Sequence, residues 1–174
     1  MSHVHQAGLP ADAAAGTVPG RGADGLLRIL GYPLALDRQY QPDTHMWVLP
    51  TGPGLVRIGM DALGVETSGT LAQLSFRAAG TGLAAGRPFG ELEAAKFVGP
   101  LLSPVTGTLV TVNEAVAADP GLAEQDPFGA GWLIEAAVER AAHHLPGLLA
   151  DPDEITAWFA GKVEEYRLSG VIAQ

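Results

Sequence analysis

Residues 93–107, Glu-Ala-Ala-Lys-Phe-Val-Gly-Pro-Leu-Leu-Ser-Pro-Val-Thr-Gly, contain one lysine between two strand-like runs. Residues 87–94 and 97–102 favour strands, and the two alanines before the lysine are small enough for a tight turn between them. This pattern predicts that Lys96 lies at the tip of a β-hairpin with its amine exposed. An exposed amine is a poor catalyst by itself, but a modifying enzyme can acylate it. We therefore interpret Lys96 as a candidate modification site. The alternative interpretation is an ordinary surface lysine in a turn.

Short strands are predicted on both sides of this hairpin. Residues 45–49 and 54–58 flank the turn signal Pro-Thr-Gly-Pro and should form another hairpin. Residues 70–76 alternate apolar and polar side chains, which would place Leu71 and Leu74 on opposite faces of a strand. Further strands are expected at 108–112 and 132–137, and a loop is expected at 80–86.

Helices are predicted at three places. Residues 61–66 favour one helical turn, and residues 120–124 favour a short helix within the connection 114–125. Asp-Pro-Asp-Glu at 151–154 is typical of a helix start, because an acidic cap, a first-turn proline and further carboxylates all suit that end. Apolar side chains follow at helical spacing and should pack on the strands. They are Ile155, Trp158, Phe159, Val163 and Tyr166.

Composition excludes several classes of protein. The 174 residues include no cysteine, so disulfides, thiolate metal sites and cysteine nucleophiles are excluded. A net charge of −9 argues against nucleic-acid binding, which depends on Lys and Arg contacts to phosphates. No apolar run approaches the ~20 residues that span a membrane, and the N-terminus lacks the features of a signal peptide. We expect a cytoplasmic protein with neither a nucleic-acid nor a membrane partner.

Side chains that could act as acids, bases or metal ligands are scattered along the chain. The candidates are Asp61, Glu66, Asp119, Glu124, Asp126, His143 and His144. Their spacing does not bring an acid, a base and a nucleophile together. His3 and His5 lack acidic or sulfur partners nearby, so no metal site is predicted. We expect a protein that is not itself an enzyme.

A series of ordered motifs extends over roughly residues 40–136. The motifs are Tyr40, His45-Met46-Trp47, Ile58-Gly59, Ser68-Gly69-Thr70, Glu93–Phe97, Ser103–Gly107, Val112–Ala115 and Asp126–Leu133. Together they resemble the H protein of the glycine cleavage system, in the lipoyl-domain superfamily. The last motif is the most specific, because its proline and glycines fix a turn and Trp132 should anchor the last strand in the core.

The resemblance implies a mainly β fold: a barrel-sandwich hybrid of two small sheets, with short helices and a C-terminal helix. It implies that lipoate is joined by an amide to Lys96 and that the lipoyl arm carries an aminomethyl intermediate in glycine decarboxylation. The implied partners are a lipoate-attaching enzyme, a glycine decarboxylase, an aminomethyltransferase and a dihydrolipoyl dehydrogenase. Glu93 would help the attaching enzyme recognise its target. A tethered intermediate visits each partner at high effective concentration.

Departures from the family pattern leave alternatives open. Met46 replaces the usual acidic residue, Phe97 replaces a small residue, and Gly99-Pro100 stands where small polar residues are common. The segment Lys-Phe-Val-Gly-Pro is similar to H-like lipoate-binding proteins associated with sulfur oxidation. A biotin carrier is a weaker alternative, because the methionines that typically flank its lysine are missing. An unmodified binding or scaffold domain of the same fold is another.

The chain divides into three parts on this reading. We expect a flexible N-terminal tail at residues 1–25, a lipoyl-type domain at 26–138 and a helical extension at 139–174. The apolar stretch Leu26–Leu36 could pack as a short strand or as an irregular arm.

Overall fold

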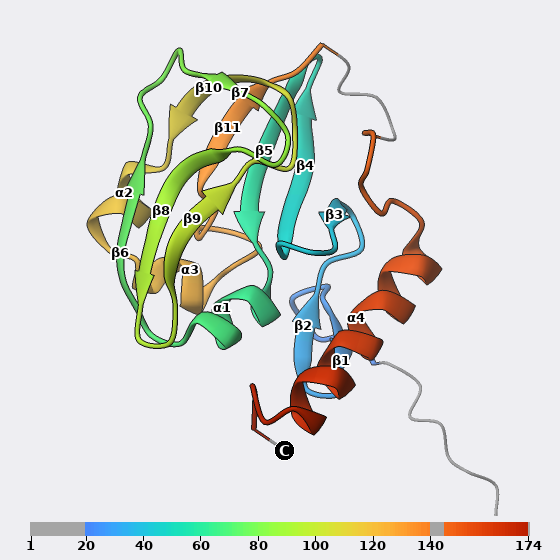
Figure 1. The fold of residues 1–174 in the computed structure, drawn as a ribbon. Coiled ribbons are helices and arrows are strands. Elements are labelled where there is room, and N and C mark those ends of the chain that lie inside the picture. Colours follow the sequence, from blue (N-terminus) through green and yellow to red (C-terminus); the bar gives the residue numbers. More distant parts are fainter. Residues whose placement is uncertain (1–19, 140–144, 174) are drawn as a thin grey trace, which may run out of the picture.

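The computed structural model describes residues 20–139 and 145–173. Two β-sheets face each other, with strand orders β3-β4-β5-β11-β10-β7 and β6-β8-β9 (Figure 1). The strands of the larger sheet are β3 (Gln39–Gln41), β4 (Met46–Gly52), β5 (Leu55–Met60), β7 (Gly82–Leu83), β10 (Gly107–Val112) and β11 (Ile134–Ala137). Those of the smaller sheet are β6 (Leu71–Phe76), β8 (Pro88–Ala94) and β9 (Val98–Leu102). The arrangement confirms the predicted barrel-sandwich hybrid.

Apolar side chains from both sheets meet between them and form what we call the main core. Its largest fully buried members are Ile58, Phe89, Leu92, Leu101, Leu109, Leu133 and Ile134. Strand alternation builds it: along β8, Leu92 and Ala94 are buried, whereas Glu91 and Glu93 are exposed. The predicted hairpin of β4 and β5 also forms, with Val48 opposite Ile58.

Strand β6 departs from simple alternation at a β-bulge. Its pairing with β8 shifts register between Leu71, opposite Ala94, and Gln73, opposite Glu93. Both Leu71 and Leu74 consequently belong to the main core. The prediction that these two leucines lie on opposite faces is wrong, because one extra residue resets the two-residue period of a strand.

The helices are α1 (Ala62–Ser68), α2 (Glu114–Ala118), α3 (Gly121–Gln125) and α4 (Pro152–Leu168). The first, third and fourth confirm the predicted helical segments. Two predictions for the connections are wrong. The connection 114–125 holds two helices instead of one, since α2 ends at Ala118, just before Pro120. Residues 82–83, within the predicted loop, pair with β10 as β7, a strand too short to show a period.

The N-terminal apolar stretch forms a hairpin of β1 (Leu27–Ile29) and β2 (Tyr32–Leu34), which lies beside α4 (Figure 1). The residues just before this hairpin are hydrogen-bonded to it or to its first residues: the Arg28 amide donates to the Gly20 carbonyl, and the Gly22 amide donates to the Leu26 carbonyl. The domain boundaries at 25 and 138 stay predictions. His3, His5, His143 and His144 lie outside the described residues.

A second core packs this hairpin and α4 against the outer face of the larger sheet. Its buried members are Leu27, Ile29, Leu34, Ala35, Tyr40, Trp47, Leu63, Phe128, Ile155, Phe159, Val163 and Ile172. Strand β4 separates the two cores: Met46 and Val48 belong to the main core and Trp47 to the second. Trp132 is only half-buried at the edge of the second core, whereas Leu133 and Ile134 anchor β11. The prediction for Trp132 is corrected accordingly.

Helix α4 begins as its sequence predicts. The Asp151 carboxylate accepts hydrogen bonds from the amides of Asp153 and Glu154, and Pro152 occupies the first turn. Ile155, Phe159 and Val163 are buried in the second core, and Trp158 and Tyr166 pack at its edge. In the part of the chain that the structure describes, no helix is long and apolar enough to cross a membrane.

Candidate functional site

Lys96 lies at the tip of the hairpin formed by β8 and β9, with its side chain exposed, as predicted. The Ala94 amide donates to the Phe97 carbonyl at 2.8 Å and closes the turn. Within the described residues, no carboxylate lies within salt-bridge distance of the Lys96 amine. The amine is therefore free to meet another protein.

The end of helix α1 holds this tip from outside the hairpin. The Lys96 amide donates to the Ser68 carbonyl at 2.9 Å, and the Ala95 amide donates to the Thr70 carbonyl at 3.0 Å. Gly69 between these acceptors has a φ of 77°, and a Cβ there would lie 3.1 Å from Lys96 Cγ. A glycine is needed at this close approach. The motif Ser68-Gly69-Thr70 was the sequence signal for this contact, although its role was not predicted.

The residues after the lysine form an apolar flank. Phe97 is 45% and Val98 74% exposed. The Phe97 ring folds back over Gly99, where an ideal Cβ would lie 2.7 Å from Phe97 Cζ. Strand β9 is the edge of the smaller sheet, and Pro100 lacks an amide that another strand could pair with. Phe97 and Gly99 therefore pack together beside Lys96, and Pro100 keeps this part of the edge strand from pairing with another strand.

Lys162 is the second of the two lysines in the sequence and has different surroundings. It lies on α4, where its Nζ is 2.9 Å from Glu165 Oε2 and 5.6 Å from the centre of the Tyr166 ring. The hydrogen bond with Glu165 raises the pKa of Lys162. Of the two amines, the Lys96 amine is the more available for acylation.

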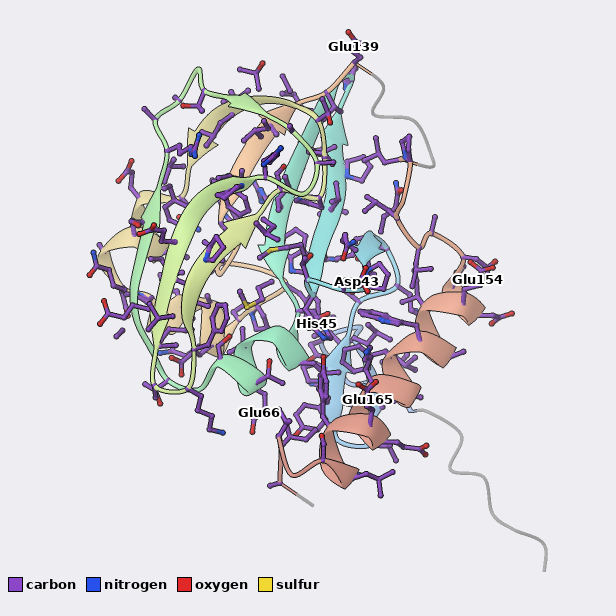
Figure 2. The ribbon with its side chains drawn as sticks, in the orientation of Figure 1. Asp43, His45, Glu66, Glu139, Glu154 and Glu165 are labelled. Carbon is purple, nitrogen blue, oxygen red and sulfur yellow. The ribbon has the colours of Figure 1, made fainter. Side chains whose placement is uncertain are left out.

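The carboxylates considered from sequence do not converge on one site. Glu124 accepts the Leu71 amide at 2.5 Å, Asp126 accepts the Ala130 amide, and Asp119 accepts the Gly121 amide. Glu66 is exposed on α1 (Figure 2). These contacts fix loops and helix ends. Asp61 is an exception, because it is fully buried and contacts a histidine.

A buried polar chain connects three elements, and sequence reasoning did not find it. His45 Nδ1 lies 2.9 Å from Asp61 Oδ2, and His45 Nε2 lies 2.8 Å from the Tyr166 hydroxyl. Burial raises the pKa of Tyr166, which keeps the hydroxyl protonated and able to donate. Asp61 is 16 positions and Tyr166 is 121 positions from His45 in the sequence, so no local sequence pattern could indicate that they meet.

Comparison with known proteins identifies the family. The sequence model described as Glycine cleavage H-protein matches residues 38–159. The Glycine cleavage system H protein of Clavibacter sepedonicus is 37% identical over 111 residues, which cover 64% of this chain and 86% of that protein. The protein of the same name from Mycobacterium sp. (strain KMS) is 30% identical over 135 residues, which cover 78% and 94%.

A solved structure agrees with both sequence comparisons. The crystal structure of a glycine cleavage system H protein from Mycobacterium marinum superposes with a TM-score of 0.62 at 31% identity, and it covers 75% of this chain and 99% of that one. The β1–β2 hairpin precedes the residues that the family model matches. From residue 38 to residue 159, sequence and fold agree, and the chain belongs to the glycine cleavage H-protein family.

Proposed function

We propose that this protein is a lipoyl carrier of the glycine cleavage system, with lipoate joined by an amide to Lys96. The observation that carries the proposal is the position of Lys96, exposed at a hairpin tip in a chain of this family. When bound, the lipoyl group supplies the dithiolane sulfur on which an aminomethyl group travels between partners. The carrier itself needs no catalytic residues for this role.

The residues around Lys96 fit such a group. Its amine has no salt-bridge partner among the described residues, so acylation would break no ion pair there. The backbone on either side of its Cα is fixed by the turn and by α1, which gives a long arm a defined origin. Glu93 is exposed on the same hairpin and is proposed to help the attaching enzyme recognise it.

The proposed partners follow from the family. A lipoate-attaching enzyme would modify Lys96, and a glycine decarboxylase, an aminomethyltransferase and a dihydrolipoyl dehydrogenase would each receive the arm in turn. A tether raises the effective concentration of an intermediate at each of these sites. The net charge of −9 favours partner surfaces that carry positive charge.

The direct test uses the fact that the sequence has only two lysines. The full chain is expressed in a lipoate-competent host, and its intact mass should rise by one lipoyl amide. Lys96→Arg should abolish the rise, whereas Lys162→Arg should keep it. A biotin mass would identify a biotin carrier instead. No adduct in any host, with a lipoate-attaching enzyme present, would contradict the proposal and favour a scaffold.

A second candidate pathway has a specific observation in its favour. Met46, where the family usually has an acidic residue, is buried in the main core, and Phe97 makes the flank beside Lys96 apolar. These features suit the H-like carriers of sulfur oxidation, which share the lysine arm. Reductive aminomethylation of the lipoylated chain by a glycine decarboxylase would support the glycine route. Failure of that reaction, together with adjacent sulfur-oxidation genes, would support the second pathway.

A further inference from the structure

His45 is the central residue of the buried chain that joins α4 to α1. Figure 2 shows it between the sheets and α4, and its side chain is 7% exposed. One ring nitrogen contacts the Asp61 carboxylate and the other contacts the Tyr166 hydroxyl. The Tyr166 and Trp158 rings lie 5.7 and 5.6 Å from the imidazole. The imidazole therefore has a defined partner on each side and a defined plane.

The backbone around His45 is also constrained. His45 has a φ of 58°, in the left-handed region that side-chain-bearing residues seldom adopt. Its carbonyl accepts the Asp61 amide at 2.8 Å, so the two residues are joined by main chain as well as by side chain. Gly64 permits this approach, because a Cβ there would lie 2.9 Å from His45 Cβ. Strain held by several contacts of this kind points to a function.

Asp61 carries the connection into α1. Its other carboxylate oxygen accepts the amides of Leu63 and Gly64, both at 2.9 Å, and so caps the helix. The far end of α1 is Ser68, whose carbonyl accepts the Lys96 amide. One short helix thus has the buried polar chain at its start and the lysine hairpin at its end.

We propose that Tyr166, His45 and Asp61 are positioning residues for Lys96, through which the C-terminal helix α4 sets the placement of α1 and hence of the lysine hairpin. The inference deepens the proposed function, since it assumes that Lys96 is the carrier lysine. Packed side chains and hydrogen bonds that are continuous in space are the physical route for such coupling.

The hydrogen-bond roles follow from the partners. Both oxygens of a buried carboxylate accept, so His45 Nδ1 donates to Asp61. In the tautomer that carries its proton on Nδ1, Nε2 is unprotonated and accepts from the Tyr166 hydroxyl. The hydrogen bonds therefore run in one direction, from the Tyr166 hydroxyl to His45 and from His45 to Asp61. Loss of the tyrosine hydroxyl leaves Nε2 without a donor and removes the hydrogen bond between α4 and the histidine, while the ring contacts remain.

The test compares Tyr166→Phe with Ser169→Ala in the unmodified full chain. Each variant removes one hydroxyl from the end of α4, but among the described residues the Ser169 hydroxyl donates only to carbonyls of its own helix, those of Glu165 and Tyr166. Amide hydrogen exchange is followed by NMR at Ala95 and Lys96, with Leu109 of β10 as the remote reference. We expect Tyr166→Phe to accelerate exchange at Ala95 and Lys96 about two- to fivefold, as loss of one hydrogen bond allows. Leu109 and the Ser169→Ala protein should be unchanged.

Equal acceleration at Leu109, or no difference between the two variants, would overturn the inference. A second measurement needs no variant: the ¹⁵N shifts of His45 should show a proton on Nδ1 and none on Nε2, and a proton on Nε2 in any form of the ring would equally refute the relay. Neither readout requires lipoate. A chain that is never lipoylated would therefore defeat the proposed function, while the exchange data would still decide whether α4 positions the hairpin.

The consequence for the carrier is tested with a lipoate-attaching enzyme. The initial rate of Lys96 acylation should fall in Tyr166→Phe and stay at the wild-type value in Ser169→Ala, at matched protein concentration. His45→Gln should retain part of the rate, because its amide can both donate to Asp61 and accept from Tyr166. An unchanged rate in Tyr166→Phe would show that the coupling does not reach the lysine.

Discussion

The two cores of this protein are built from different side chains. The main core is almost entirely aliphatic, with Phe89 as its buried aromatic ring and Phe76 beside it. The second core takes all three tryptophans and all three tyrosines of the sequence, and it includes the buried chain through His45. Aliphatic side chains that alternate along strands are sufficient to fill the space between two sheets. Aromatic side chains with a polar edge can also donate hydrogen bonds, which helps to join segments that are far apart in the sequence.

The difference shows where each core obtains its specificity. In the main core, register fixes which side chains meet, and any well-fitting aliphatic side chain serves. In the second core, directed contacts fix the arrangement. Trp47 Nε1 donates to the carbonyls of Met60 and Pro127, and the Tyr40 hydroxyl donates to Ala35 at 2.6 Å. Arg38 stacks over the Trp47 ring at 4.5 Å.

The largest expected effect comes from the main core. Phe89→Ala removes a fully buried ring and should lower the free energy of unfolding by about 3–5 kcal/mol. Urea denaturation is followed by far-UV circular dichroism, which reports the whole fold, and by tryptophan fluorescence, which reports the second core. Both midpoints should fall together if the cores unfold as one unit. Fluorescence that keeps its wild-type midpoint would show that the second core stands alone.

A smaller effect is expected at the boundary between the cores. An ideal Cβ at Gly59 would lie 2.3 Å from the Trp47 ring, so Gly59→Ala should cost about 1–3 kcal/mol by overpacking. Gly52→Ala is the control, since its Cβ would meet nothing within 4 Å. Thermal unfolding measures both variants. Equal melting temperatures would show that Trp47 can move aside at little cost, and that β4 does not hold the two cores apart.

The smallest effect is expected at the start of α4. Asp151→Ala removes a side-chain cap and should cost about 1 kcal/mol, mainly in the second core. Gly161→Ala in the exposed middle of the same helix should instead stabilise by about 0.5–1 kcal/mol, because alanine favours helix. The two variants should move the fluorescence midpoint in opposite directions. Shifts of the same sign would mean that the stability of α4 does not control the second core.

Prediction from sequence succeeded where a structure depends on a short stretch of neighbouring residues. The hairpin around Lys96, the β4–β5 pair and the start of α4 each follow from a few neighbouring residues. It failed at the bulge in β6, where one residue breaks the period, and at β7, which is too short to have one. The contact of Ser68 with Lys96 depends on tertiary structure, so the motif Ser68-Gly69-Thr70 marked the segment but not its partner. The pairing of His45 with Tyr166 also depends on tertiary structure, and it had no local sequence signal.

The turn at Lys96 constrains how any partner recognises it. Three successive amides, those of Ala94, Ala95 and Lys96, already donate to carbonyls of this same chain. A partner protein therefore cannot accept a hydrogen bond from a main-chain amide at these positions and cannot pair a strand with them. Discrimination between this tip and other exposed lysines must come from side chains and carbonyl oxygens. The exposed side chains beside Lys96 that a partner can contact are Glu93, Phe97 and Val98.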